Sequence, residues 1–242
     1  MFGKLCLLLV FMSLALLVWP RGGVVADDTT VIRMATIAPK SSKPMRILRA
    51  WDKTVRKSSE GRIRFRFYSG GIAGDERDVI RKMRIEQLDA TSLTSVGLGQ
   101  IERSASVLQV PGLFRSYREL DAVRSEMDLQ WRDSFREAGF ELLGWFDVGF
   151  GRYFSRRPVK RPSDLKGVRP WVWRDDPVFP ELMKVVGANG VALGLPEVLP
   201  GLQTGMVDTV VASPVAALGL QWFRHLKYMS KQADTALVGA TL

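Results

Sequence analysis

Short apolar stretches alternate with amphipathic stretches of helical period along most of the chain, and Gly, Pro or Ser stands at nearly every junction. This alternation is typical of α/β architecture, in which helices flank a sheet. The expected strands cover residues 31–38, 62–68, 89–94, 140–148, 168–173, 191–195 and 207–212. No internal repeat is present. The predicted fold class is therefore α/β.

Residues that suit a helix N-terminus stand where the first helices are expected to begin. Ser41 or Ser42 caps the first helix, and Asp75 caps the second. Ser116 and Glu119 form a capping box for the third, because each side chain can bond the backbone N–H of the other residue. Apolar residues at helical spacing follow each of these starts.

Later helices are expected over residues 177–186 and 196–204, and from Pro214 onward. Pro200 has no backbone N–H to donate inside the second of these, so we expect a kink or an early break there. The helix from Pro214 carries four apolar residues at helical spacing, Val215, Leu218, Trp222 and Leu226. His225 is expected to be an exposed or core-edge residue of that helix.

The N-terminus has the layout of a secretory signal peptide. Lys4 precedes an apolar run over residues 5–19, which is shorter than the roughly 20 residues that a membrane-spanning helix needs. A small-residue cleavage pattern ends at Ala26, and the acidic pair Asp27 and Asp28 follows. We expect cleavage after Ala26 and a mature chain without a membrane span. The alternative is an uncleaved anchor.

Cysteine and histidine are scarce. Cys6 is the only cysteine and lies inside the expected signal peptide, and His225 is the only histidine. The mature chain is therefore expected to have no disulfide, no thiolate nucleophile and no Cys or His cluster for a metal. No catalytic residue, metal site or cofactor is predicted, and stability is expected to come from burial.

The chain is strongly basic, with a net charge of +10, and loss of Lys4 and Arg21 with the signal peptide leaves +8. Lysines and arginines are scattered among acids rather than gathered in a run. This pattern favours a solvated basic surface over a nucleic-acid tract. The glycine-rich segment over residues 70–74 lacks the lysine and hydroxyl of a phosphate loop, and we interpret it as a turn.

Four segments carry a family resemblance. They read "YSGGIAGDERDVIRKMRIEQLDA", "RRPVKRPSDLKG", "GANGVAL" and "PEVLPGLQTGMVD", in that order along the chain. Their order and spacing resemble the solute-binding receptors of tripartite ATP-independent periplasmic (TRAP) transporters, the DctP-like family. The resemblance covers nearly the whole mature chain.

The resemblance implies a two-lobed periplasmic-binding-protein fold, with a sheet and flanking helices in each lobe. After the signal peptide at 1–26, lobe I is expected over 27–148 plus 214–242, and lobe II over 149–213. Family members usually continue past the position of Leu242, so lobe II is expected to be incomplete on its C-terminal side. The partners implied are a small organic ligand, captured between the lobes in the periplasm, and a TRAP-type membrane permease.

Some of the residues that bind the ligand in this family are replaced in the present chain. An arginine that pairs with the ligand carboxylate follows the "DLKG" turn, and Trp171 stands at that position here. Arg169 lies two residues earlier, so along a strand it shares the face of Trp171. After "QTGMVD", Val211 and Ala212 replace a glutamate and an asparagine, and Ser213 follows them. The site is therefore expected to be more apolar than the family's.

Other candidates complete the predicted site. Arg152 matches a second family arginine and is expected to hold one acidic group, and Trp173 shares the strand face of Trp171. Thr36, Thr94 and Ser95 stand at expected strand ends and are candidates for hydrogen bonds to the ligand. Each of these residues has a structural alternative as core or as a turn cap.

Three functions remain open at this point. The first is a TRAP-type receptor for a monocarboxylate or largely apolar solute. The second is an exported binding protein that presents its ligand to a sensor or a lipid-handling partner. The third is an exported enzyme that acts through Asp175, Asp176 or Glu197, although adjacent acids at helix starts are usually caps.

Overall fold

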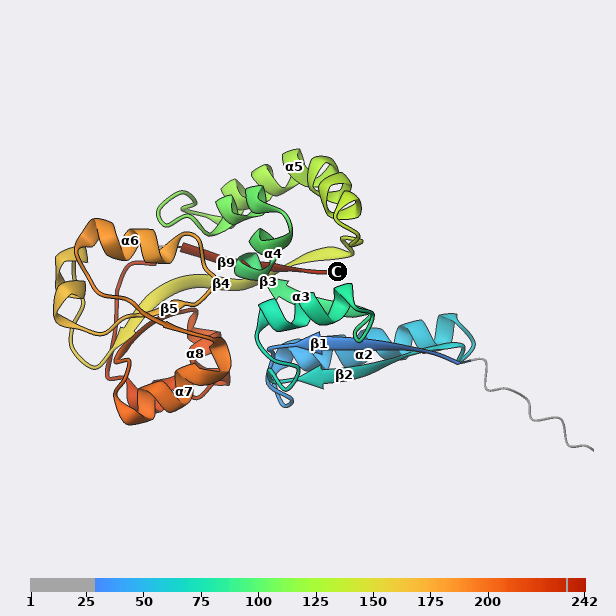
Figure 1. Cartoon of the computed structure of the whole chain (residues 1–242), viewed down its shortest axis with the longest axis horizontal. Coiled ribbons are helices and arrows are strands. Elements are labelled where there is room, and N and C mark those ends of the chain that lie inside the picture. The colour runs from blue at the N-terminus through green and yellow to red at the C-terminus, as the bar shows by residue number, and fades with distance from the viewer. Residues whose placement is uncertain (1–28, 234) are drawn as a thin grey trace, which may run out of the picture.

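One sheet carries most of the strands, and its order is β2-β1-β3-β9-β4-β7, with β8 paired to β4. The structure, a computed structural model, describes residues 29–233 and 235–242 (Figure 1). The expected signal peptide therefore lies outside the described residues. The seven strands of this sheet are β1 (Thr30–Thr36), β2 (Ile63–Ser69), β3 (Ala90–Thr94), β4 (Gly144–Ser155), β7 (Thr209–Ala212), β8 (Tyr228–Met229) and β9 (Thr235–Thr241).

The N-terminal part of the molecule, residues 29–143, is built on β1, β2 and β3, which pair in parallel. Its helices are α2 (Lys43–Ser58), α3 (Glu76–Arg84), α4 (Ser95–Ile101) and α5 (Tyr117–Glu137), with the 3-10 helix η1 (Arg103–Gln109). One hydrophobic cluster joins α3, α4, α5 and η1, and Leu98, Leu120, Trp131 and Phe135 are fully buried in it. Burial of such large apolar side chains is the main stabilising contribution here.

The C-terminal part, residues 156–229, has a second sheet in which β5 (Trp171–Trp173) and β6 (Val191–Leu193) pair in parallel. Its helices are η2 (Pro162–Gly167), α6 (Phe179–Val186), α7 (Leu195–Thr204), α8 (Pro214–Gly219) and η3 (Trp222–His225). Val198, Leu202, Val207 and Val210 are fully buried among them. The two parts therefore have separate hydrophobic clusters.

Strands β4 and β9 run through the middle of the molecule, between the two parts (Figure 1). The first half of β4 pairs with β9, and its second half pairs with β7 and β8. The register shifts between Asp147 and Gly149, where Gly149 has a φ of 122° that favours glycine. The two parts are thus connected by a continuous sheet.

The predicted helix starts at Ser42, Asp75 and Ser116 are confirmed, because each side chain accepts a backbone N–H of the helix that follows it. The early break expected at Pro200 is wrong, since α7 continues to Thr204. Proline removes a single backbone bond there, while buried Val198 and Leu202 hold the helix on its core.

The single helix expected from Pro214 through Leu226 is also wrong. Helix α8 ends at Gly219, and η3 begins at Trp222. Gln221 between them has a left-handed φ of 60°, which ends helical geometry. Of the four residues at helical spacing, Trp222 is buried and Leu226 packs against the same cluster, whereas Val215 and Leu218 are exposed. The apolar spacing therefore identified only part of the core, because it assumed one continuous helix.

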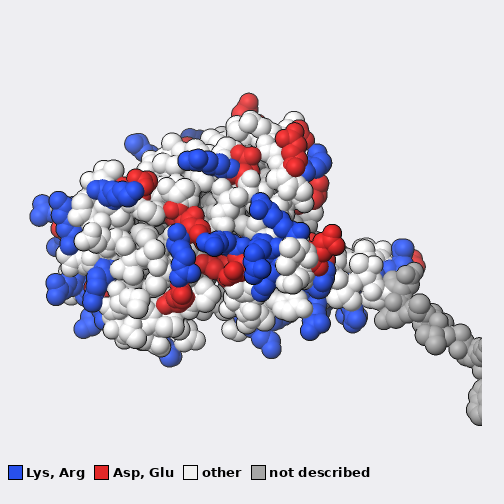
Figure 2. Space-filling model, in the orientation of Figure 1, with Lys and Arg blue, Asp and Glu red and all other residues white. Residues whose placement is uncertain are grey.

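Basic side chains are spread over the face shown in Figure 2, with acidic side chains between them. This distribution agrees with the scattered pattern in the sequence. Within residues 29–233 and 235–242, no helix combines the length and the apolar character needed to cross a bilayer.

Candidate functional site

A crevice lies where the C-terminal ends of β1 and β2 face α7. It contains a cavity of about 280 Å³, which is lined by Ile37, Pro39, Gly70, Gly71, Leu195, Pro196, Leu199, Gly219, Leu220 and Gln221. None of these lining residues is charged. The carboxyl edge of parallel strands is where α/β proteins usually bind ligands. The crevice is therefore the candidate binding site.

A larger cavity of about 670 Å³ lies elsewhere, against α2, β2 and the end of α5. Its walls include Trp51, Phe65, Met83 and Phe140, all from the N-terminal part. It also borders Ile32, near the N-terminal end of β1. Because this cavity is at the opposite strand ends and touches no residue of the C-terminal part, the smaller one fits a two-part site better.

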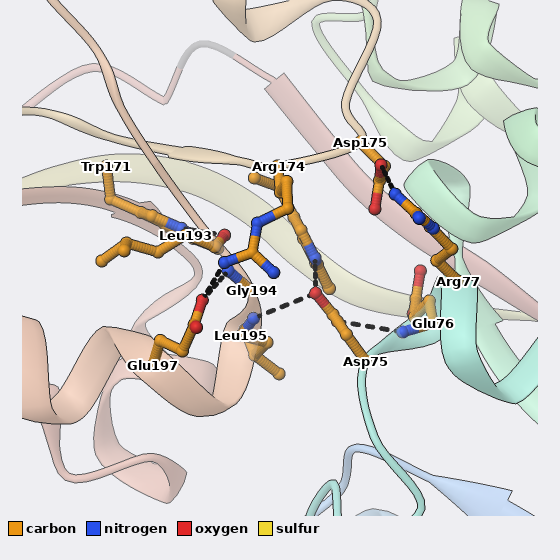
Figure 3. A network of polar contacts seen from close by, with 11 residues as sticks. Asp75, Glu76, Arg77, Trp171, Arg174, Asp175, Leu193, Gly194, Leu195 and Glu197 are labelled. Carbon is orange, nitrogen blue, oxygen red and sulfur yellow. Dashed lines mark hydrogen bonds and ion pairs between the residues drawn. The ribbon is translucent and has the colours of Figure 1, made fainter.

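Asp75 joins the two parts at the edge of the crevice (Figure 3). Its Oδ1 accepts the backbone N–H of Glu76 at 2.9 Å, which caps α3. Its Oδ2 accepts the indole N–H of Trp173 at 2.8 Å and the backbone N–H of Leu195 at 3.3 Å. Burial raises the pKa of Asp75, although the Trp173 bond opposes that effect. Sequence reasoning identified only the capping role.

Two further contacts join the parts. Gln109 donates from Nε2 to Oδ1 of Asp176 at 3.2 Å, and both side chains are buried. Asp176 also accepts the backbone N–H groups of Val178 and Phe179 at the start of α6. Burial raises the pKa of Asp176. The third contact, Arg77 to Asp175 at 3.3 Å, is mostly exposed on the arginine side.

Glu76 is fully buried and holds the end of β3 against the start of α4. Its carboxylate accepts the N–H of Thr94 at 2.6 Å, the hydroxyl of Thr94 at 2.9 Å and the N–H of Gly97 at 2.7 Å. Burial raises the pKa of Glu76 to about 7. The sequence carried a signal for it, since Glu76 precedes buried Val79 and Ile80 by three and four residues.

The candidates at the strand ends have local partners. The Thr36 hydroxyl accepts the Ala38 N–H at 3.2 Å, and the Thr94 hydroxyl donates to Glu76. The Ser95 hydroxyl donates to Oε1 of Gln109 at 2.9 Å. None of the three lines the cavity, and their contact with a ligand stays a prediction.

The two candidate tryptophans lie together. Trp171 is buried, and its ring centroid is 5.6 Å from that of Trp173 and 5.4 Å from that of Trp222. Its indole N–H donates to the carbonyl of Leu193 at 3.0 Å. This packing indicates a core contribution for Trp171, and ligand contact by either indole stays a prediction.

Arg169 lies just before β5, which begins at Trp171, and Pro170 between them pairs with Thr209 in an isolated parallel bridge. Its guanidinium is exposed and donates from Nε to Asp208 at 3.2 Å, while its backbone N–H donates to the same carboxylate. Ligand contact by Arg169 stays a prediction.

The remaining candidates lie on β4 and at the end of β7. Arg152 is half-buried and pairs in register with Ala212. Its Nη1 donates to the carbonyls of Ser230 and Lys231, and its other nitrogens have no acceptor among the described residues. Val211 packs against the α6 cluster, and buried Ser213 caps α8 by accepting the Ala216 N–H at 3.2 Å.

The carboxylates of the enzyme hypothesis have structural partners. Asp175 pairs with Arg77, and Asp176 accepts the backbone N–H groups of Val178 and Phe179 at the start of α6. Glu197 pairs with Arg174 and accepts the Gly194 N–H at 2.7 Å (Figure 3). Across the described part of the chain, no three His, Cys, Asp or Glu side chains gather in a way that could hold a metal.

Similarity to known proteins identifies the family of this chain. A family model described as bacterial extracellular solute-binding protein, family 7 (DctP), matches residues 34–242. A solute-binding protein of Chromohalobacter salexigens is 29% identical over 177 residues, which cover 71% of this chain and 52% of that protein. The 2,3-diketo-L-gulonate-binding periplasmic protein YiaO of Escherichia coli K12 is 25% identical over 181 residues, covering 73% and 54%.

Solved structures show the same fold. A TRAP periplasmic solute-binding protein from Pseudomonas putida F1, with bound D-glucuronate, has a TM-score of 0.81 and 26% identity, and the match covers 88% of this chain and 70% of that one. A TRAP periplasmic solute-binding protein from Sulfitobacter has a TM-score of 0.82 and 21% identity, and the match covers 88% of this chain and 71% of that one. The chain spans about half the length of the curated relatives named above.

Proposed function

The chain belongs to family 7 of the bacterial extracellular solute-binding proteins, and from that premise we propose that it is the solute receptor of a TRAP-type transport system. It captures a small organic acid in the crevice between its two parts and delivers it to a membrane permease. It acts in the periplasm and binds its solute without chemical turnover. The cavity between the β1 and β2 ends and α7 is the observation that carries the proposal.

The two parts act as lobes that close around the solute. Lobe I holds residues 27–148 and the C-terminal strand, and lobe II begins at 149. Because Ala217 and Trp222 pack in the cluster of the C-terminal part, we assign residues 214–229 to lobe II rather than lobe I. Strands β4 and β9 connect the lobes, with Gly149 at the irregularity in β4.

The solute is a monocarboxylate with an apolar body. The Pseudomonas putida protein holds D-glucuronate, and the Escherichia coli relative is named for 2,3-diketo-L-gulonate, so both are described with sugar-derived acids. The cavity of the present chain has no charged lining residue and is walled by Ile37, Leu195, Leu199 and Leu220. A volume of about 280 Å³ lies near the small end of the range for ligand pockets, roughly 300–1,000 Å³.

Arg152 supplies the cation for the acid group from outside the uncharged lining of the cavity. It is half-buried in β4, and its Nη1 donates to the backbone carbonyls of Ser230 and Lys231, while its other nitrogens have no acceptor among the described residues. A guanidinium with remaining donors can bind a carboxylate through a charge-assisted pair. Burial of a carboxylate without such a partner would cost several kcal/mol.

Calorimetric titration with benzoate, benzamide and D-glucuronate tests the proposal. We expect benzoate to bind more tightly than D-glucuronate, because its ring suits the apolar walls, and more tightly than the neutral benzamide. Arg152→Gln should reduce benzoate affinity by roughly tenfold or more, the value of one charge-assisted pair, and leave benzamide unchanged.

Leu199→Gln places a polar group in the cavity wall and should weaken benzoate binding. Leu218→Gln makes the same change at an exposed position of α8 and is the matched control. Tighter binding of D-glucuronate than of benzoate would refute the apolar solute class. Absence of binding by every acid in the panel, with a cooperatively folded protein, would count against the receptor function.

A further inference from the structure

Two aspartates, Asp75 and Asp176, each accept hydrogen bonds from the opposite part of the molecule. Asp75 is half-buried, caps α3 in the N-terminal part and accepts hydrogen bonds from Trp173 and Leu195 in the C-terminal part. Asp176 is buried, accepts the N–H groups of Val178 and Phe179 at the start of α6, and accepts a hydrogen bond from Gln109 in the N-terminal part. Each carboxylate therefore ties a helix start of its own part to the opposite part.

The Asp75 contact is built for close approach. A Cβ on Gly194 would lie 2.7 Å from Oδ2 of Asp75, so a larger residue at position 194 would displace the carboxylate. Gly194 has a φ of −70°, which any residue can adopt. The backbone conformation at position 194 therefore does not require glycine. The close approach of the Asp75 carboxylate does require it, because a Cβ would occupy the same space.

The same contact lies next to the candidate cavity. Leu195, whose backbone N–H bonds Asp75, lines the cavity, and Gly71 in the turn before Asp75 lines it from the other side. A Cβ on Gly71 would also lie 3.4 Å from the side chain of Pro196. Separation of Asp75 from Leu195 would therefore open the cavity.

The Arg77–Asp175 pair contributes less to this arrangement. The arginine side chain is 69% exposed, and exposed ion pairs contribute little because water and salt screen them. Hydrogen bonds to a charged, partly buried carboxylate contribute more. The contacts of Asp75 and Asp176 thus dominate the polar contribution to closure.

We propose that Asp75 is the positioning residue that holds the two lobes closed over the cavity, with the Gln109–Asp176 contact as its counterpart in the opposite direction. The proposal deepens the proposed function and rests on it only in the role of closure, namely retention of a solute. At Asp75, one carboxylate oxygen accepts a hydrogen bond from its own lobe and the other accepts one from the opposite lobe (Figure 3).

The variant Asp75→Asn separates the capping of α3 from the contact between the lobes. Asparagine is as good a helix N-cap as aspartate, so its single oxygen can keep the Glu76 N–H. Its NH₂ group then faces the Trp173 and Leu195 N–H groups, and two donors cannot bond each other. The variant should therefore fold while it loses the contact between lobes.

Distances between spin labels measure closure without any solute. In a Cys6→Ser background, labels go on Ile47→Cys in α2 and Val185→Cys in α6, which are exposed positions on opposite lobes. We expect one narrow distance distribution, and a second population in Asp75→Asn. Loss of hydrogen bonds to a charged group should shift the open-to-closed ratio by roughly tenfold or more.

Asp78→Asn makes the same charge change on the exposed side of α3 and should leave the distances unchanged. Gly194→Ala should reproduce the second population while the Asp75 charge stays. Distances that are unchanged in both Asp75→Asn and Gly194→Ala would overturn the proposal. Because no solute is present, a failed solute titration leaves this test intact, and unchanged distances leave the receptor function standing.

Discussion

Glu76 is the residue where burial and charge oppose each other most. Its carboxyl group is fully buried and has hydrogen-bond donors but no cation among its partners in the described chain. Burial disfavours the charged form, so the pKa rises from 4.5 to about 7. The residue holds the β3–α4 turn through its bonds to Thr94 and Gly97.

The raised pKa of Glu76 gives stability a definite pH dependence. Between pH 4.5 and pH 7 the folded state binds more protons than the unfolded state, so the free energy of unfolding falls as pH rises. Glu76→Gln removes this contribution. We expect the variant to gain about 3 kcal/mol relative to wild type across that window, from roughly 1.36 kcal/mol per pKa unit. Urea unfolding at several pH values measures the difference.

Glu126→Gln, which makes the same change at an exposed position of α5, is the matched control. Because only the difference between variant and wild type is used, other titrating groups cancel. An unfolding difference for Glu76→Gln that stays constant from pH 4.5 to pH 7 would show that Glu76 has an ordinary pKa.

At the scale of elements, the packing of β9 between β3 and β4 requires that position 239 has no side chain. Gly239 pairs with Thr94 on one side and with Phe146 on the other, at the centre of the sheet. A Cβ there would lie 2.2 Å from the Leu93 carbonyl oxygen and 2.3 Å from the Phe146 ring. Strand β9 joins β3 to β4, so this packing holds the sheet together.

We expect Gly239→Ala to lower the free energy of unfolding by about 2–4 kcal/mol, since backbone and ring must both move. Gly144→Ala is the matched control, because a Cβ at Gly144 meets no atom within 4 Å and the residue lies in the same sheet. Denaturant unfolding of both variants measures the effect. Equal losses in the two would show that the crowding at Gly239 is not decisive.

Among the elements, patterns within a helix or strand were sufficient for the helix starts and for most strands. They were insufficient for β9, for which no strand was predicted, and for β5, which is shorter than the 168–173 stretch. Gln221 likewise divides a segment whose apolar spacing is continuous. In each case the partner strands or the neighbouring core decide where the element ends.

At the scale of the whole molecule, β4 contributes to the hydrophobic clusters of both parts, with Trp145 and Phe150 in one and Phe154 in the other. Strand β9 pairs with β4 and with β3 in the same sheet. We therefore expect the two parts to unfold together. Native-state hydrogen exchange followed by mass spectrometry should give similar opening free energies for the most protected peptides of β9 and β7. The control is α2, which lies outside the shared strands.

A difference of several kcal/mol between the β9 and β7 peptides would contradict this expectation and indicate two independent units. Such a result would also show that the sheet shared by the two lobes does not couple their stability. Similar values would support a single cooperative unit in which the crevice is a permanent feature of the fold.

The sequence by itself determined the α/β class, the helix caps and the family, because these depend on residue spacing and on motifs whose members are close along the chain. It also predicted a site depleted of charge, although the cavity is lined by different residues from those named. Of the predicted candidates, Arg152 donates to the carbonyls of Ser230 and Lys231, and Trp171 is buried in the core. Ligand contact by either residue stays a prediction.

Only the tertiary structure decided which residues meet across the crevice. Asp75 and Trp173 are 98 residues apart, and Gln109 and Asp176 are 67 apart. No period in the sequence relates such positions, since their contact depends on how two separately packed bodies are set against each other by β4 and β9. Burial, which raises the pKa values of Asp75, Glu76 and Asp176, arises from that same packing.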